Sequence, residues 1–461
     1  MSEEGLRQAT ERMRRRGIDE RAIGVFVDYY HQLEAGTTGY IPESTIDPLG
    51  DVPRLEDLDV EPETAAEALR HTVVIKLNGG LGTSMGLSGP KTALVVREGL
   101  TFLDVIARQV LALRGEYGAQ VPLLLMDSFR TREESLAILA SYPDLPVEGL
   151  PLDFVQNAEP KLRADNLEPV DWPDDPSLEW CPPGHGDIYV SLLTTGLLDA
   201  LRDMGFRYAF LSNSDNLGAT CDPRIPAWMA REGIPYVSEV CDRTVNDTKG
   251  GHLAVRRRDG RLILRDSAMT APGEEGYFAD NERHRLFHAN NLWVDLEVLG
   301  ARLAVRDGVL GLPIIVNRKT VDPTRKDSTK VIQVESAMGT AIEVFEGSRA
   351  LHVPRSRFRP VKTTNELLLL RSDRFALDEA SRVVTRTDTP DPGIDLDRHY
   401  ADIVAFDERF PAGPPSLVGC TSLTVRGDVT FGAGVVCVGD VRIEAAAATT
   451  VPDGARLDGS G

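Results

Sequence analysis

The sequence predicts an α/β fold built around a mixed, mostly parallel sheet that is flanked by helices. Short β-branched apolar runs alternate with longer amphipathic stretches from residue 71 onward, which is typical of strands connected by helices. The first of these runs, 71–77, leads directly into a glycine-rich loop. The last fifty residues repeat apolar and small residues with a period of six, which is typical of a parallel β-helix.

Three regions are expected along the chain. Residues 1–70 predict a helical N-terminal leader, which begins with a charged amphipathic helix and ends in a Pro- and acid-rich run. Residues 71–385 predict one α/β domain, and residues 386–461 predict the small C-terminal β-helix domain. The N-terminal stretch lacks the apolar centre of a secretory signal, so a cytoplasmic location is expected.

The α/β region is expected to contain its strands and helices in alternation. Strands are predicted at 71–77, 121–126, 152–157, 208–211 and 235–240, and helices at 101–115, 131–142, 187–203, 223–233 and 363–375. Residues 254–266 predict an antiparallel hairpin because Asp259 and Gly260 supply the residues that a tight connection needs. The sheet should therefore carry an antiparallel insertion.

The C-terminal repeat follows more than one track. Small residues keep the same six-residue step as two apolar tracks, Leu417, Leu423, Val429, Val435, Val441 and Val425, Phe431, Cys437, Ile443. A left-handed parallel β-helix is favoured over ordinary antiparallel strands because several tracks share one period. The open end of such a coil is a possible surface for homo-oligomer formation.

Composition excludes several classes of protein. The 461 residues include 51 Lys and Arg against 71 Asp and Glu, a net charge of −20, which argues against binding to nucleic acid or to an anionic membrane. The longest apolar runs are far shorter than the ~18 residues of a membrane span. The five cysteines include no CxxC pair, so neither disulfides nor a zinc site are expected. His284 and His288 have helical spacing, but a solvated helix face is favoured over a metal site.

The most informative segment is the loop after the first strand, VVIKLNGGLGTSMGLSGPK at 73–91. Glycines at the end of a strand let backbone N–H groups approach an anion. The dinucleotide fingerprint GxGxxG fails because Met85 occupies its third glycine position. The P-loop pattern fails because Pro90 precedes Lys91. A Rossmann dehydrogenase and a P-loop kinase are both disfavoured.

The loop instead fits the pattern L-x-G-G-x-G-T-x-M-x-x-x-x-P-K, and further blocks follow it along the chain. These are FVQNAEPK (154–161), CPPGHGD (181–187), SNSDNLGAT (212–220), KGG (249–251), FHANNLWV (287–294), PIIVNRK (313–319), IQVESAMGTAI (332–342) and RFRPVKTTNELLLL (357–370). In this order the set resembles the eukaryotic-type UDP-glucose pyrophosphorylase family over nearly the whole chain. The resemblance implies a nucleotidyltransferase fold and Mg²⁺-dependent transfer of the uridylyl group of UTP to α-D-glucose 1-phosphate, which gives UDP-glucose and pyrophosphate.

The resemblance also implies where the nucleotide binds. Gln156 and the backbone at Gly184 should hold the uracil, and His185 should face the sugar phosphate. The segment beneath the base and ribose comprises Leu77, Asn78, Gly79 and Gly80. An amide such as that of Gln156 can accept from uracil N3–H and donate to a ring carbonyl, which cytosine cannot match. Without the flanking blocks, an ordinary surface glutamine would be the simpler interpretation.

Asp215 is the expected metal ligand. It follows a predicted strand at its carboxyl end, where α/β sheets bind ligands, and one carboxylate plus substrate phosphates commonly hold Mg²⁺. An Asx turn is the alternative interpretation for this loop. Other residues should contact the substrate: Asn213 and Ser214 beside the metal, Asn290 and Asn291 as paired amides for sugar hydroxyls, and Gly250 and Gly251 as room for the pyranose ring.

Two lysines are the expected catalytic residues. Lys91 closes a rigid Gly-Pro-Lys segment and should hold the β- and γ-phosphates, while Lys362 should bridge the attacking phosphate and the α-phosphate. A sugar 1-phosphate is already largely dianionic at neutral pH, so no general base is required. In-line phosphoryl chemistry instead needs alignment and neutralised charge.

Two alternatives differ in how they use the same fold. A broad UDP-sugar or UDP-N-acetylhexosamine pyrophosphorylase would share the loop but not the sugar pocket. A non-catalytic UDP-sugar-binding protein would be expected to lack Lys91, Asp215 or Lys362, and all three are present.

Overall fold

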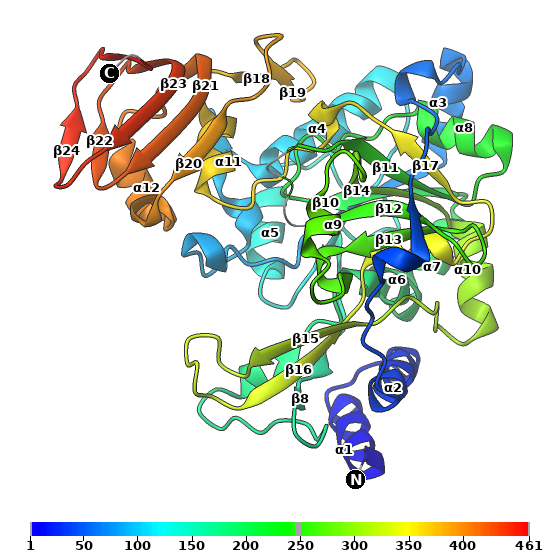
Figure 1. Ribbon diagram of the computed structural model, residues 1–461. Helices are drawn as coiled ribbons and strands as arrows, with labels where there is room; N and C mark the ends of the chain where they lie inside the picture. Colours follow the sequence, from blue (N-terminus) through cyan, green and yellow to red (C-terminus); the bar gives the residue numbers. More distant parts are fainter. Residues whose placement is uncertain (1, 245–246, 248–249, 460–461) are drawn as a thin grey trace.

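A computed structural model describes residues 2–244, 247 and 250–459. Within these residues the central element is a ten-stranded sheet whose main path runs β1-β12-β14-β10-β2-β5-β6 (Figure 1). Four neighbours are parallel: β10 (Tyr208–Asn213), β2 (Thr72–Leu77), β5 (Leu123–Asp127) and β6 (Asp153–Val155). The predicted α/β fold with a mainly parallel central sheet and flanking helices is confirmed.

The antiparallel part of the sheet lies on the other side of β10. β14 (Leu286–Asp295) runs antiparallel to β10 and also to β11 (Tyr236–Asp242), which pairs in parallel with β17 (Arg349–His352). The predicted hairpin is present as β12 (Gly251–Arg256) and β13 (Leu262–Asp266), with Gly260 at φ +70° in its loop. β1 (Ile46–Pro48), from the N-terminal region, adds a strand to β12.

Helices cover both faces of the sheet because its strands are apolar on both sides. On one face Val74 of β2 packs in a cluster with α4 (Phe102–Tyr117) and α8 (Arg224–Glu232). On the other face Val73 and Ile75 pack in a second cluster with α6 (Ile188–Thr194), α7 (Leu197–Asp203) and α10 (Leu296–Val305). Further helices are α3 (Pro62–Arg70), α5 (Arg132–Leu139) and α9 (Glu275–Ala279).

The first two helices pack on a separate small sheet. α1 (Ser2–Arg15) and α2 (Glu20–Glu34) share an apolar cluster with β8 (Leu162–Arg163) and β16 (Lys330–Glu335), and β15 (Ile315–Thr320) completes that sheet (Figure 1). Three two-stranded pairs complete the strands before residue 390: β3 (Val95–Arg97) with β4 (Leu100–Thr101), β7 (Glu159–Pro160) with β9 (Trp180–Cys181), and β18 (Phe375–Leu377) with β19 (Val383–Thr385).

The expectation of a solvated helix face at His284 and His288 is wrong. His288 is buried within β14, and His284 is buried in the turn before it, where its ring stacks on that of His252 with centroids 3.8 Å apart. His284 Nε2 also contacts Glu43 Oε1 at 3.2 Å. The described residues contain no group of three or more His, Cys, Asp or Glu side chains placed to hold a metal.

The C-terminal strands pair in parallel rather than antiparallel. One sheet runs β20 (Gly393–Leu396), β21 (Ser416–Arg426), β23 (Val436–Glu444), β25 (Arg456–Asp458), and β22 (Val429–Phe431) pairs with β24 (Thr449–Val451). Leu423 pairs with Val441, and Phe431 pairs with Val451. The alternative of ordinary antiparallel strands is therefore wrong. α12 (Ile403–Arg409) packs beside these strands (Figure 1).

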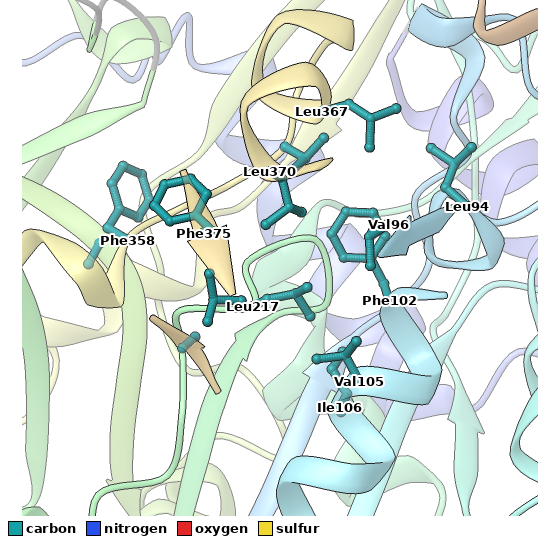
Figure 2. Close-up of a cluster of buried hydrophobic side chains, with 14 of the residues drawn as sticks. Leu94, Val96, Phe102, Val105, Ile106, Leu217, Phe358, Leu367, Leu370 and Phe375 are labelled. Carbon is teal, nitrogen blue, oxygen red and sulfur yellow. The ribbon is translucent and has the colours of Figure 1, made fainter. Parts of the chain in front are cut away.

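One apolar cluster connects the helices to the loops that follow the sheet. Figure 2 shows Leu367 and Leu370 of α11 (Thr364–Arg371) near Val96 and Phe102, with Leu217 and Phe358 in the same cluster. Leu217 follows β10, and α11 begins two residues after Lys362. The core thus fixes both segments that carry predicted functional residues. No helix among the described residues is long and apolar enough to cross a bilayer.

Candidate active site at the carboxyl edge of the parallel strands

The structure brings the predicted metal ligand and one predicted catalytic lysine together. Asp215 lies in the loop after β10, and Lys91 Nζ donates to its Oδ2 at 2.8 Å. Both side chains are mostly buried, with 14% of Lys91 and 22% of Asp215 exposed. The second oxygen, Asp215 Oδ1, is buried and has no hydrogen-bond partner among the described residues. A buried carboxylate oxygen without a donor suits a cation, so Asp215 fits a Mg²⁺ ligand.

The segment that carries Lys362 is hydrogen-bonded to the Asp215 loop. Val361 N–H donates to the carbonyl of Asp215 at 3.1 Å, and Arg359 N–H donates to Asn216 Oδ1 at 2.8 Å. Lys362 is exposed and directly precedes Thr363, the N-cap of α11. Thr363 and Glu366 form a capping box, which fixes where the helix starts. Lys362 therefore projects from a backbone that is anchored on both sides.

A buried ion pair between Glu239 and Arg357 is hydrogen-bonded to the Asp215 loop. Glu239 of β11 is fully buried, and its carboxylate accepts from Arg357 Nε at 2.8 Å and Nη2 at 2.6 Å. Trp293 Nε1 and Asn291 Nδ2 donate to the same carboxylate, each at 3.0 Å. The carbonyl of Arg357 in turn accepts from Asn216 Nδ2 at 3.0 Å. We call Glu239, Arg357, Asn291 and Asn216 the anchor network.

The anchor network was not predicted from the sequence, although two signals were present. Glu239 is a single carboxylate inside the apolar strand 235–240, and Arg357 opens the block RFRPVK. A lone charge in a buried strand requires a partner, because an unpaired buried charge is costly. The sequence does not show that this partner is an arginine more than a hundred residues away.

On the nucleotide side, the glycine loop and Gln156 are in contact. A Cβ on Gly79 would lie 2.8 Å from Gln156 Nε2, so only glycine lets this amide approach the loop. The next residue, Asn157, donates through its backbone N–H to Asp187 Oδ2 at 2.6 Å. Asp187 follows Gly184, which has φ +82° and approaches the backbone of Ser336. Gln156, Gly184 and the glycine loop, which are expected around the uracil, thus come from segments that touch.

The side chain of Asn78 is engaged inside the protein, which leaves only its backbone for a ligand. Its side chain is buried, with Nδ2 donating to Asp127 Oδ1 and to Ser135 Oγ, each at 2.7 Å, while Thr92 Oγ1 donates to its Oδ1. Burial raises the pKa of Asp127 to about 6. This network holds the glycine loop against β5. Leu77 ends β2, and its carbonyl accepts from the N–H and Oγ of Ser214. Gly80 is exposed, with open space where a Cβ would stand.

His185, which is expected to face the sugar phosphate, is half-buried. The residue starts a short 3₁₀ turn that continues into α6. Met338 N–H donates to His185 Nδ1 at 3.0 Å, which places the ring proton of the neutral form on Nε2. Burial lowers the pKa of His185, so the neutral form is favoured. His185 Nε2–H is then a neutral donor for a phosphate or sugar oxygen.

The two neighbouring asparagines of β14 point to different surroundings, since adjacent strand residues face opposite sides. Asn290 is half-buried with φ +54°, and its Nδ2 donates to Asn213 Oδ1 at 3.1 Å. Asn291 is fully buried, and its amide belongs to the anchor network. The expectation that both amides face the sugar is therefore wrong for Asn291. Asn290 and Asn213 remain together at the site.

The expected role of Gly250 and Gly251 also needs correction. A Cβ on Gly250, which has φ +123°, would lie 2.7 Å from the Phe287 ring. A Cβ on Gly251 would lie 2.8 Å from Leu264 and 2.9 Å from the carbonyl of Arg265. Protein packing therefore accounts for both glycines without a pyranose ring. Lys249, the first residue of the same block, lies outside the described residues.

In the loop that contains Asp215, the alternative interpretation as an Asx turn is correct for one residue, Asn216. Asn216 Oδ1 accepts from Gly218 N–H at 3.2 Å, which is the local hydrogen bond of such a turn. Asp215 makes no such bond, because its Oδ2 accepts from Lys91 and its Oδ1 has no described partner. The turn thus uses Asn216 and leaves the Asp215 carboxylate directed to Lys91.

Comparisons with known proteins agree with this geometry. A family model described as UTP–glucose-1-phosphate uridylyltransferase matches residues 24–437. The enzyme of that name from Solanum tuberosum is 37% identical over 449 residues, covering 95% of this chain and 92% of the relative. The one from Saccharomyces cerevisiae is 38% identical over 395 residues, covering 85% and 77%.

Solved structures agree over nearly the full length. A mutant UDP-glucose pyrophosphorylase from Leishmania major in complex with UDP-glucose superposes with a TM-score of 0.93 at 43% identity, covering 99% of this chain and 98% of that one. A UDP-glucose phosphorylase from Trypanosoma brucei gives 0.92 at 43% identity, covering 98% of each chain. The chain therefore belongs to the UTP–glucose-1-phosphate uridylyltransferase family.

Proposed function

We propose that this protein transfers the uridylyl group of UTP to α-D-glucose 1-phosphate and releases pyrophosphate, in a reversible reaction. The observation that carries the proposal is the convergence of Lys91, Asp215 and the Lys362 segment at one edge of the sheet, next to the contact between Gly79 and Gln156. Family members with these names support the same reaction. All three charged residues expected to be absent from a non-catalytic relative are present.

The reaction needs alignment and charge neutralisation rather than a proton acceptor. The dianionic phosphate of the sugar attacks the α-phosphorus of UTP, and pyrophosphate leaves in line. Lys362 would bridge the attacking phosphate and the α-phosphate, while Lys91 would bind the β- and γ-phosphates. Mg²⁺, when bound, would neutralise phosphate charge, and the residue that would hold it is Asp215 through Oδ1.

The nucleotide and the sugar are assigned to neighbouring parts of this edge. Gln156 and the Gly184 backbone would recognise the uracil, with the backbone of 77–80 beneath it. His185 Nε2–H would donate to a phosphate or sugar oxygen, and the pair Asn213 and Asn290 would face sugar hydroxyls, with Ser214 holding the loop to Leu77. Asn291 belongs to the buried anchor network, and packing within the protein already accounts for Gly250 and Gly251.

The C-terminal region supports a second part of the proposal. Paired strand residues are separated by 18 positions, as for Leu423 and Val441, or by 20, as for Phe431 and Val451. Eighteen residues are three steps of the six-residue repeat, so residues 386–461 fit coils of a left-handed parallel β-helix. The divisions at residues 70 and 385, and self-association through the exposed edge of β25, belong to the same proposal. Light scattering of the purified protein tests the self-association.

The reaction is tested by pyrophosphate release. Purified protein is incubated with UTP and Mg²⁺ and with glucose, galactose or N-acetylglucosamine 1-phosphate, while CTP and ATP serve as nucleotide controls. Rapid release with UTP and glucose 1-phosphate alone is the expected result. Comparable rates with several sugar 1-phosphates would favour the broad UDP-sugar pyrophosphorylase. No pyrophosphate release with any nucleotide and sugar pair would favour a non-catalytic UDP-sugar-binding protein.

A further inference from the structure

A cavity of about 400 Å³ lies among α3, α4, α8 and the side of β2 that bears Val74 and Lys76, and it reaches the segment 219–224 that follows the Asp215 loop. Cavities of about 300–1,000 Å³ are typical of small-molecule sites. Its walls are mainly apolar, with Ala65 and Pro62 of α3, Ile106 and Val110 of α4, and Val74 of β2. The proposed reaction uses none of these residues.

Lys76 is the unusual group in this cavity. Its side chain is 2% exposed, and its Nζ donates to Ser212 Oγ at 2.8 Å and to the carbonyl of Ala219 at 2.7 Å. Both acceptors are neutral. Among the described residues no carboxylate lies within ion-pair distance of this ammonium. A buried charge is normally paired, because leaving it alone in an apolar surrounding is costly.

The other charges in the cavity are already neutralised. Asp222 accepts from Arg224 through both oxygens, at 3.0 and 2.7 Å, and Arg382 donates to Asp378 at 2.9 Å. Glu116 is exposed. The cavity thus combines apolar walls, two closed ion pairs and one buried cation that lacks a counterion.

We propose that this cavity is a binding site for a small organic monocarboxylate with an apolar body, whose carboxylate is the counterion of Lys76. A single ammonium in apolar walls suits a singly charged head, whereas a phosphate dianion would need more donors than the cavity offers. An aromatic or branched hydrocarbon body would occupy the space between α3 and α4. This inference does not rest on the proposed reaction.

The protonation state of Lys76 gives the proposal a signature. Burial lowers the pKa of Lys76 to about 7, and nearby Cys221, Arg357, Glu239 and Asp215 make smaller contributions. Near neutral pH part of the protein therefore carries an uncharged amine. Since a carboxylate binds the ammonium form, binding takes up protons, and its affinity falls as the pH rises above about 7.

The position of the site also connects it with the Asp215 loop. Ser212 is the penultimate residue of β10 and Ala219 follows the Asp215 loop, so Lys76 holds both flanks of the segment that contains Asp215. A carboxylate on Lys76 would compete for the same N–H donors.

Isothermal titration calorimetry with 2-naphthoate tests the proposal on the full-length protein. We expect saturable binding with a Kd below about 1 mM, and proton uptake when buffers of different ionisation enthalpy are compared. Lys76→Met should weaken 2-naphthoate at least about tenfold, the effect of losing a charged partner, while the neutral 2-naphthamide should bind both proteins alike. Lys161→Met, the same change at another buried lysine, should have no effect.

A second variant keeps the test decisive if Lys76→Met does not fold. Ala65→Phe narrows the cavity from α3 without touching Lys76, and it should also weaken 2-naphthoate. Equal binding to wild type, Lys76→Met and Ala65→Phe would overturn the proposal. The absence of saturable binding to wild type, or displacement of 2-naphthoate by UTP, would overturn it as well.

Discussion

Polar side chains at the two ends of β10 and β14 differ in their burial and in their hydrogen-bond partners. At the end where β10 starts, Arg207 Nε donates to Asp295 Oδ2 at 3.0 Å, and Asp295 also caps α10. The Arg207 side chain is 55% exposed, so water reaches this pair. At the other end Glu239 and Arg357 are buried, and Asp215 keeps one oxygen without a described partner.

This difference distinguishes a carboxylate that only stabilises the fold from one that is able to bind a ligand. Asp295 is fully used by a cap and an ion pair, so it has nothing left to offer a ligand. Asp215 is held by Lys91 on one side and has an unused oxygen on the other. Buried polar atoms without partners are costly and are retained where they serve function. The comparison therefore supports the proposal that the reaction takes place at the carboxyl edge.

The largest expected effect is that of Asp215→Asn. The amide keeps the shape of the side chain but removes the charge that would bind Mg²⁺ and pair with Lys91. We expect kcat to fall about 10²-fold or more, the scale of losing a preorganised electrostatic group. The matched control is Asp295→Asn, at the opposite end of the strands. It should lower stability and leave kcat nearly unchanged, and equal losses of kcat in both variants would break the comparison.

Breaking the anchor network should have the second-largest effect. In Glu239→Gln the guanidinium of Arg357 stays buried without its charged partner, which costs about 3–5 kcal/mol in stability by analogy with other broken buried pairs. Because Arg357 holds Asn216, kcat should also fall about tenfold, with a smaller change in KM for UTP.

Denaturant unfolding and steady-state kinetics well below the unfolding temperature measure both quantities. Arg207→Met is the control, since it breaks the pair at the other end, whose arginine is 55% exposed, and about 0–1 kcal/mol is expected there. A loss of stability in Glu239→Gln with kcat unchanged would show that the network is structural only.

Gln156→Leu should affect recognition more than chemistry. The leucine keeps the volume but removes the donor and acceptor assigned to uracil. We expect kcat/KM for UTP to fall about 10- to 100-fold, while the preference for UTP over CTP decreases. Competition between the two nucleotides measures the preference. An unchanged ratio would remove Gln156 from the uracil site.

The smallest effect is a slope in stability with pH. The folded pKa of Lys76 is about 7 and its ordinary value is 10.5, so between these values the unfolded chain binds more protons. The contribution of Lys76 to the free energy of unfolding therefore rises with pH, by up to about 1.4 kcal/mol per unit. Unfolding of wild type and Lys76→Met from about pH 6 to pH 9 should show their difference moving in favour of wild type. A constant difference would contradict this.

Local patterns were sufficient to predict the alternation of strands and helices, the hairpin at 251–266 and the position of Asp215 after a strand. They depend on periodicity, turn residues and the edge at which parallel strands end. The partner of Glu239 could not be predicted because Arg357 lies far away in the sequence. The partners of Lys76 could not be predicted because Ser212 is also distant and the other acceptor is the backbone carbonyl of Ala219. The different environments of Asn290 and Asn291 were also not predicted, because the two residues are chemically identical and only the strand geometry places them on opposite sides of β14.

The most direct test of the account is the rate of Lys362→Ala in both directions of the reaction, compared with Lys326→Ala at an exposed position. If Lys362 bridges the attacking phosphate and the α-phosphate, its loss should lower kcat about 10²-fold or more for UDP-glucose synthesis and for its pyrophosphorolysis. Lys326→Ala should match wild type. Near-normal turnover of Lys362→Ala would contradict the assignment of the reaction to this edge.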